Sequence, residues 1–185
     1  MSALEHAPRQ DGEHEENEGV RLDGAQLEPE EMAVAARRRA ALREATEALG
    51  EGRVIVMPTD TVYGVGADPF NPDGVAGLLA AKGRGREKPP AVLVPSAETV
   101  DGLAMNVPSY ARRLMERFWP GGLTLIFRAQ PSLMWDLGDT NGTVGLRVPD
   151  DEIALELLRS SGPMAVSSAT QVLPIWLTSG SDDPA

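Results

Sequence analysis

Apolar side chains recur at helical spacing where the chain first becomes rich in them. Over residues 29–49 they return at intervals near three, four and seven, which predicts an amphipathic helix ended by Gly50. The β-branched run 54–57 is closed by Pro58 and predicts a buried strand. Residues 62–66 predict a second extended segment, so the chain turns back after Pro58.

Helical and extended patterns then alternate as far as residue 169, which predicts the α/β class. On the predicted helix over 108–118, the apolar face consists of Tyr110, Leu114 and Phe118. Asp150 is expected to cap a helix that turns Ile153, Leu157 and Leu158 inward and ends at Gly162. The expected strands are 91–94, 123–127, 143–148 and 164–167, and the further helices are 72–82, ended by Gly83, and a short one capped by Ser96.

Composition divides the chain into three parts. Residues 1–28 are acidic and poor in large apolar side chains, so we expect a disordered arm. Residues 29–170 are expected to form one α/β domain, incomplete on its C-terminal side, and residues 171–185 a divergent tail. Residues 1–31 carry a net charge of −8, so only −3 of the total of −11 belongs to the rest. The overall charge therefore does not exclude a nucleotide ligand.

Other features of the composition narrow the class of protein. The chain has no cysteine, which excludes disulfides, thiolate metal sites and cysteine nucleophiles. It shows neither a signal peptide nor an apolar run of the roughly 20 residues that a membrane helix needs. We therefore expect a cytoplasmic protein with no membrane partner.

Two segments in the first half carry groups suited to chemistry. The turn 58–64 (PTDTVYG) places three small oxygen-bearing side chains after a strand, where α/β proteins bind ligands; a turn that bonds its own backbone is an equal alternative. The segment 82–90 (KGRGREKPP) holds four cations in seven residues and suits phosphate or carboxylate, although a solvated basic loop is the commoner meaning of such a pattern.

Two segments in the second half add to these. In 143–149 (TVGLRVP), Arg147 points opposite to Leu146 and Val148 by alternation, so it requires an anion from the protein or from a ligand. A structural ion pair is the commoner outcome. In 167–170 (SSAT), hydroxyl and N–H groups at a strand end suit phosphate oxygens, and an ordinary turn explains them as well.

Taken together and in order, these segments resemble the YrdC-like threonylcarbamoyl-AMP synthases, also called the TsaC family. The matching pieces are PTDTVYGVGAD, AKGR followed by KPP, FWPGGLTLIF, TVGLRVPD and GPMAVSSA, within residues 35–169. The resemblance implies a twisted mixed sheet with flanking helices around a concave, positively charged cleft. It also implies a nucleotidyltransferase that joins L-threonine, bicarbonate and ATP, with Mg²⁺, into threonylcarbamoyl-AMP and pyrophosphate.

The resemblance assigns roles to particular residues. Thr61 and Arg147 would bind threonine, and Lys82, Arg84 and Ser168 match the catalytic signature of the family. ATP would be held by Arg84, Lys88, Thr143, Ser168 and the backbone of Val166, with no metal ligand among the protein side chains. The partners implied are tRNA or double-stranded RNA and the proteins that later transfer the threonylcarbamoyl group to adenosine 37 of tRNA.

The sequence also departs from the family pattern near its end. Thr170 stands where the family has Asn, and residues 171–173 replace the usual Leu-Ser-Gly. The further strands of the family do not follow, which predicts a shortened or divergent C-terminal side and impaired activity. The alternatives are a catalytically impaired module that binds nucleotide or RNA, a damaged chain prone to association, and a carbamoyl-transferring relative.

Overall fold

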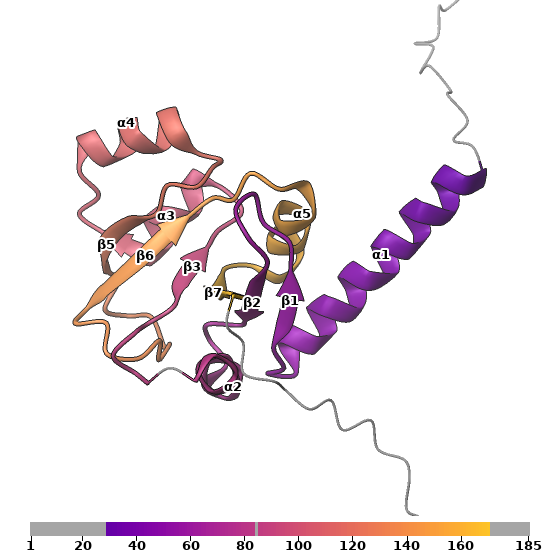
Figure 1. Cartoon of the computed structure of the whole chain (residues 1–185). Helices are drawn as coiled ribbons and strands as arrows, with labels where there is room; N and C mark the ends of the chain where they lie inside the picture. The colour runs from indigo at the N-terminus through magenta and orange to yellow at the C-terminus, as the bar shows by residue number, and fades with distance from the viewer. Residues whose placement is uncertain (1–28, 84, 171–185) are drawn as a thin grey trace, which may run out of the picture.

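Seven strands form one mixed sheet in the computed structural model, which describes residues 29–83 and 85–170 (Figure 1). Their order is β1-β2-β7-β3-β6-β5-β4, and every neighbouring pair is antiparallel except β3 and β6. The strands are β1 (Ile55–Met57), β2 (Gly64–Ala67), β3 (Ala91–Leu93), β4 (Ala104–Met105), β5 (Leu125–Ala129), β6 (Thr143–Arg147) and β7 (Met164–Ser168). The helices are α1 (Pro29–Gly50), α2 (Pro72–Lys82), the 3₁₀ helix η1 (Ala97–Thr99), α3 (Val100–Leu103), α4 (Ser109–Phe118) and α5 (Glu152–Ser161).

The two faces of the sheet build two hydrophobic clusters. On one face Val65, Val92 and Leu146 are buried together with residues of α2, α3 and α4. On the other face Leu93 and Met164 are buried against α1 and α5. Since side chains alternate along a strand, β3 and β7 contribute to both clusters, through Val92 and Ala165 on one face and Leu93 and Met164 on the other. The α/β class and the mixed, twisted sheet predicted above are therefore confirmed.

Helix α2 has well-defined ends, which fixes the position of its last residue. The side chain of Asn71 accepts from the backbone N–H groups of Asp73 and Gly74 at the N-terminus. Gly83 adopts the left-handed conformation at the C-terminus, and its N–H donates back to the last turn. Lys82 is thereby held at the point where the chain leaves the helix.

Helix α1 extends away from the body at its N-terminal end (Figure 1). Its C-terminal half packs through Leu42 and Leu49, while Arg38 forms ion pairs with Glu152 and Glu156 of α5. None of the helices within the described ranges has both the length and the apolarity needed to cross a membrane.

Five local predictions are wrong. Helix α4 buries Ala111 and Met115, whereas Tyr110 and Phe118 are exposed, because the face that meets the sheet is narrow and carries small or flexible side chains. In α5, Ala154 is buried in place of Ile153, and the capping side chain is that of Asp151, whose carboxylate accepts from Ala154 N–H, not that of Asp150.

The other two concern a strand and a cap. Strand β1 lies at the edge of the sheet, so Val56 is exposed and the strand is not buried on both faces. Ser96 precedes η1 without making a capping hydrogen bond to its backbone. The two-residue strand β4 was not predicted, and β5 begins two residues later than its apolar run.

Candidate functional site

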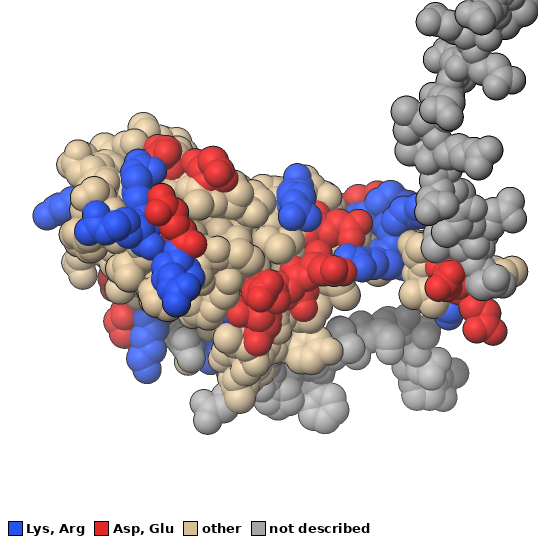
Figure 2. Space-filling model, turned by 90° about the horizontal axis from the view of Figure 1, so that it is seen from above, with Lys and Arg blue, Asp and Glu red and all other residues tan. Residues whose placement is uncertain are grey.

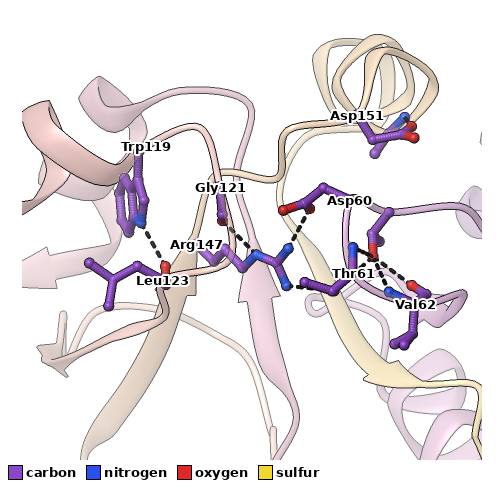
Figure 3. Close-up of polar contacts among 10 residues, drawn as sticks. Asp60, Thr61, Val62, Trp119, Gly121, Leu123, Arg147 and Asp151 are labelled. Atoms are coloured by element: carbon purple, nitrogen blue, oxygen red, sulfur yellow. Dashed lines mark hydrogen bonds and ion pairs between the residues drawn. The ribbon is translucent and has the colours of Figure 1, made fainter.

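The site is built around Arg147 at the end of β6. Leu146 and Val148 turn into the core, so alternation directs Arg147 to the opposite face, as predicted. Its Nε donates to the carbonyl of Gly121 (2.8 Å) and its Nη1 to Oγ1 of Thr61 (3.2 Å). Its Nη2 forms an ion pair with Asp60, and the Arg147 side chain is only 12% exposed (Figure 3). The guanidinium thus joins three segments that are far apart in the sequence.

A tight loop after α4 supplies one of these acceptors. The indole Nε1 of Trp119 donates to the carbonyl of Leu123 (2.7 Å), and Gly121 N–H donates to the carbonyl of Val148 (2.9 Å). A Cβ atom on Gly121 would lie 2.7 Å from the Phe118 carbonyl oxygen, so only glycine fits this backbone. The loop therefore positions the Gly121 carbonyl for Arg147.

The turn between β1 and β2 supplies the other two partners. Oγ1 of Thr59 accepts from the N–H groups of Thr61 and Val62 (3.3 Å each) and donates to the Val62 carbonyl (2.5 Å). This is the self-bonded turn considered as an alternative in the sequence. It is also compatible with the ligand-binding hypothesis, because the turn fixes Asp60 and Thr61 beside Arg147 (Figure 3).

Several predicted site residues share one face of the sheet. In β6, Thr143 and Arg147 point the same way, since four residues separate them, and they lie roughly 13 Å apart along the strand. The register of β6, β3 and β7 places Val166 and Ser168 on that same face. Between them Gly145, Ala91 and Val166 form a floor without bulky polar groups. The helices α1 and α5 cover another part of this face, so the stretch from Ser168 to Arg147 is the part left open to a ligand.

Lys82 approaches the same region from the layer beneath. Its side chain is buried at 7% exposure, and Nζ donates to the carbonyls of Ser168 and Thr170 at 2.5 Å each. The Thr170 hydroxyl donates in turn to Oγ of Ser168 (3.2 Å). Lys82 therefore holds the end of β7, where Ser168 lies.

The basic segment does not present four equivalent cations. Arg86 forms a bidentate ion pair with Asp136 (3.0 and 2.7 Å) and lies 3.6 Å from Asp139. The hydrogen bond from Arg86 lowers the pKa of Asp136, as does the backbone N–H of Gly138. Lys88 is exposed, and Arg84 lies outside the described residues. The segment 85–90 is thus tied to the loop that precedes β6.

The same register places Lys88 near Thr143. Ala91 lies beside Gly145 in parallel strands, so the chain just before β3 runs beside the start of β6. The Asp139 N–H also donates to the Arg86 carbonyl (2.8 Å), which closes the two segments together. The hydroxyl of Thr143 donates to the Thr140 carbonyl (2.8 Å) in this state.

Sequence reasoning missed two groups that shape the site. Asp60 was present in the PTDT turn but had no assigned role, although Arg147 was expected to need an anion. The carbonyl of Gly121 could not be assigned from sequence, because a backbone acceptor leaves no signal beyond the glycine itself.

Within the described residues, no three or more His, Cys, Asp or Glu side chains gather as a metal site.

A cavity of about 470 Å³ lies between η1, α4 and α5 and contains none of the predicted site residues. Two of its lining residues, Trp119 and Pro120, belong to the loop after α4 whose Gly121 carbonyl accepts from Arg147. The chemistry-bearing groups described above therefore lie on the sheet face and outside this cavity.

Comparison with known proteins identifies the family of the chain. The sequence model of the Sua5/YciO/YrdC family, described as "Telomere recombination", matches residues 47–174. The chain belongs to this family. A Mycobacterium tuberculosis relative named "Putative threonylcarbamoyl-AMP synthase" is 57% identical over 125 residues, which cover 68% of this chain and 58% of the relative. The chain thus spans less than two thirds of the length of that protein.

Solved structures of Sua5 from Pyrococcus abyssi show the same architecture as this family member. The H234A/Y235A variant superposes with a TM-score of 0.67 at 36% identity, covering 70% of this chain and 40% of that one. Sua5 complexed with L-threonine gives a TM-score of 0.64 at 37% identity, covering 69% and 38%. The Sua5-like fold therefore accounts for the described domain.

Proposed function

We propose that the chain carries out the synthesis of threonylcarbamoyl-AMP. The α-amine of L-threonine would attack the carbon of bicarbonate, forming an N–C bond with loss of water. An oxygen of the resulting carbamate would attack the α-phosphorus of ATP, and the bond to the departing pyrophosphate would break. The reaction thus joins two anions, so positioning and charge neutralisation are the main tasks of the protein.

Threonine would bind at the Arg147 end of the open face. The guanidinium of Arg147 would take the carboxylate, and the hydroxyl of Thr61, which already lies 3.2 Å from Nη1, would add a hydrogen bond. Arg147 is held in place by the Gly121 carbonyl, so its orientation is set before a ligand arrives.

ATP would bind along the stretch that leads to Thr143 and Ser168. Lys88 and Arg84 would neutralise phosphate charge, while Thr143, Ser168 and the backbone of Val166 would hydrogen-bond the nucleotide. Lys82 would contribute to catalysis chiefly by fixing the end of β7, given its two bonds to backbone carbonyls. Mg²⁺ would come with the nucleotide, since the described residues offer no carboxylate cluster and Mg²⁺ on a nucleotide keeps phosphate and water ligands.

The observation that carries the proposal is the shared sheet face. Four of the predicted residues lie on it, and a fifth, Thr61, contacts Arg147 directly. This arrangement supports a site that holds an amino acid and a nucleotide in one groove. The product would then pass to the proteins that modify adenosine 37 of tRNA.

The test is formation of threonylcarbamoyl-AMP by the purified full chain. ATP, Mg²⁺, L-threonine and bicarbonate should together yield pyrophosphate and the adenylate, and mass spectrometry detects both products. Omission of either threonine or bicarbonate should abolish both products. Arg147→Lys should lose most of the activity, whereas Arg117→Lys on the exposed side of α4 should not. A cooperatively folded chain that forms no adenylate under these conditions would refute the proposal.

A second candidate, RNA binding without turnover, is favoured by the surface of α4. Arg113 and Arg117 are exposed beside Tyr110 and Phe118, and basic side chains gather over the end of the molecule that carries α4 (Figure 2). Basic and aromatic side chains together suit single-stranded RNA. Salt-dependent binding of RNA that weakens in an Arg113→Ala/Arg117→Ala variant would support it, and binding unchanged in that variant would reject it.

A further inference from the structure

The anion site around Arg147 already contains an anion of its own. Asp60 forms an ion pair with Nη2, and the side chains of the pair are 12% and 16% exposed. The carbonyl of Gly121 and the hydroxyl of Thr61 accept two further N–H bonds. A guanidinium has five N–H donors, so acceptors in the described chain account for three and leave up to two for a ligand.

The position of Asp60 is fixed by the turn that carries it. The hydroxyl of Thr59 bonds the backbone of Thr61 and Val62, which follow Asp60, and Pro58 precedes the turn. The bond to Arg147 uses Oδ1 of Asp60, and no described residue donates to Oδ2. One carboxylate oxygen is therefore left to accept from a ligand bound at Arg147.

The pair presents one positive and one negative group side by side. A simple carboxylate would be attracted by Arg147 and repelled by Asp60. A zwitterionic amino acid matches both, because its carboxylate and its ammonium group are attached to the same carbon. Complementary charge of this kind contributes more to discrimination between ligands than to affinity as such.

We propose that Asp60 is a specificity-determining residue that binds the α-ammonium group of the amino-acid substrate, so that the site accepts zwitterions and rejects carboxylates without an amine. The inference rests on the proposed function, because it takes Arg147 as the carboxylate-binding group. It assigns to Asp60 a contact with substrate beyond its ion pair with Arg147.

The experiment compares two ligands on the full chain by calorimetry: L-threonine and 3-hydroxybutyrate, which keeps the carboxylate and the hydroxyl but lacks the amine. The native chain should bind threonine and bind 3-hydroxybutyrate at least about tenfold more weakly. Asp60→Asn keeps the shape and an acceptor for Arg147 but removes the charge. The variant should bind threonine about tenfold or more weakly than the native chain does and should bind 3-hydroxybutyrate more tightly. The preference for threonine over 3-hydroxybutyrate would thus be reversed or abolished.

Two further variants separate specificity from structure. Asp60→Glu retains the charge and should keep the preference for threonine, which also provides a test if the asparagine variant does not fold. Asp150→Asn removes an exposed acid on the loop after β6 and should leave the preference unchanged. The inference would be overturned if Asp60→Asn lowers the affinity for both ligands equally, or if Asp60→Glu loses the preference for threonine over 3-hydroxybutyrate. A native chain that binds no threonine would instead overturn the proposed function itself.

Discussion

The substitution Lys82→Met tests whether Lys82 stabilises the folded chain or serves only to bind a ligand. Lysine is rarely buried unless it is paired, yet the Lys82 side chain is 7% exposed and its ammonium group donates to the carbonyls of Ser168 and Thr170. Methionine keeps a flexible stem of similar length and removes the ammonium group. The substitution therefore deletes the polar contacts and preserves most of the packing.

The expected loss follows from two opposing effects. Hydrogen bonds from a charged donor contribute about 1.5–3 kcal/mol each, and removing both leaves two carbonyls without their donor. Removing a buried ammonium also relieves its desolvation, which offsets part of that loss. We expect the free energy of unfolding to fall by about 1–3 kcal/mol, which lowers the urea midpoint by roughly 0.5–1.5 M.

Urea denaturation followed by circular dichroism measures this change directly. The matched control is Lys88→Met, because Lys88 carries the same charge six residues later and is exposed. Its midpoint should stay within about 0.3 M of the native chain, since exposed substitutions change stability little. If Lys82→Met unfolds at or above the native midpoint, the ammonium group does not stabilise the end of β7 and the structural role assigned to Lys82 is refuted.

Three further perturbations test the site and the core. In a calorimetric titration, Gly121→Ala should weaken threonine binding about tenfold or more, because it displaces the carbonyl that orients the site arginine. The control Gly122→Ala, whose Cβ would meet only an ordinary contact at 3.6 Å, should bind threonine as the native chain does. Leu157→Ala should cost about 2–5 kcal/mol in urea unfolding, while Ile153→Ala should cost less than about 1 kcal/mol because that side chain is 39% exposed; equal losses would contradict the observed face of α5. The pKa of Asp136 is lowered by its arginine partner, so the pair persists at neutral pH and is lost as pH falls through the lowered pKa; carbon-13 NMR should show a lower midpoint in the folded chain than in the urea-unfolded one.

The elements that the sequence predicts well have strong local signals. Helix α2 begins after Asn71 and ends at Gly83, and both ends are set by residues whose capping chemistry is readable in the sequence. Strand β6 alternates between buried and open positions, which is why the outward direction of Arg147 could be predicted. The ends of α2 are set by interactions within a few residues, and the alternation along β6 follows from strand geometry even though its pairing with β3 and β5 is not local.

The predictions that are wrong depend on tertiary neighbours. Tyr110 and Phe118 are large and apolar, and pattern alone assigned them to the interface of α4. The sheet beneath α4 admits Ala111 and Met115 instead, and aromatic side chains with one face in water are common at a protein surface. Helical periodicity specifies that an apolar stripe exists, but the partner surface selects which stripe is buried.

The convergence of the site could be predicted only in part. The family resemblance assigned both Thr61 and Arg147 to threonine binding. In the structure, Nη1 of Arg147 lies 3.2 Å from Oγ1 of Thr61. That contact depends on the twist of the sheet, which moves the turn after β1 to the end of β6, and twist over several strands is not encoded in any local motif. The pairing of Asp60 with Arg147 follows from the same geometry.

The distribution of charge along the open face then constrains how a polyanion is held. Of the cations in segment 82–90, Lys82 is committed to the carbonyls of β7 and Arg86 to Asp136, while Arg147 is balanced by Asp60. Lys88 is the cation of that segment that the described structure leaves exposed without a bonded carboxylate. A triphosphate bound near Thr143 would meet Lys88 and also Arg128, which is exposed and is paired with Thr143 across β5 and β6, so we infer that these cations and the Mg²⁺ it would carry share the compensating charge. In the proposed complex, backbone and hydroxyl groups would position the nucleotide, and these cations together with its Mg²⁺ would balance its charge.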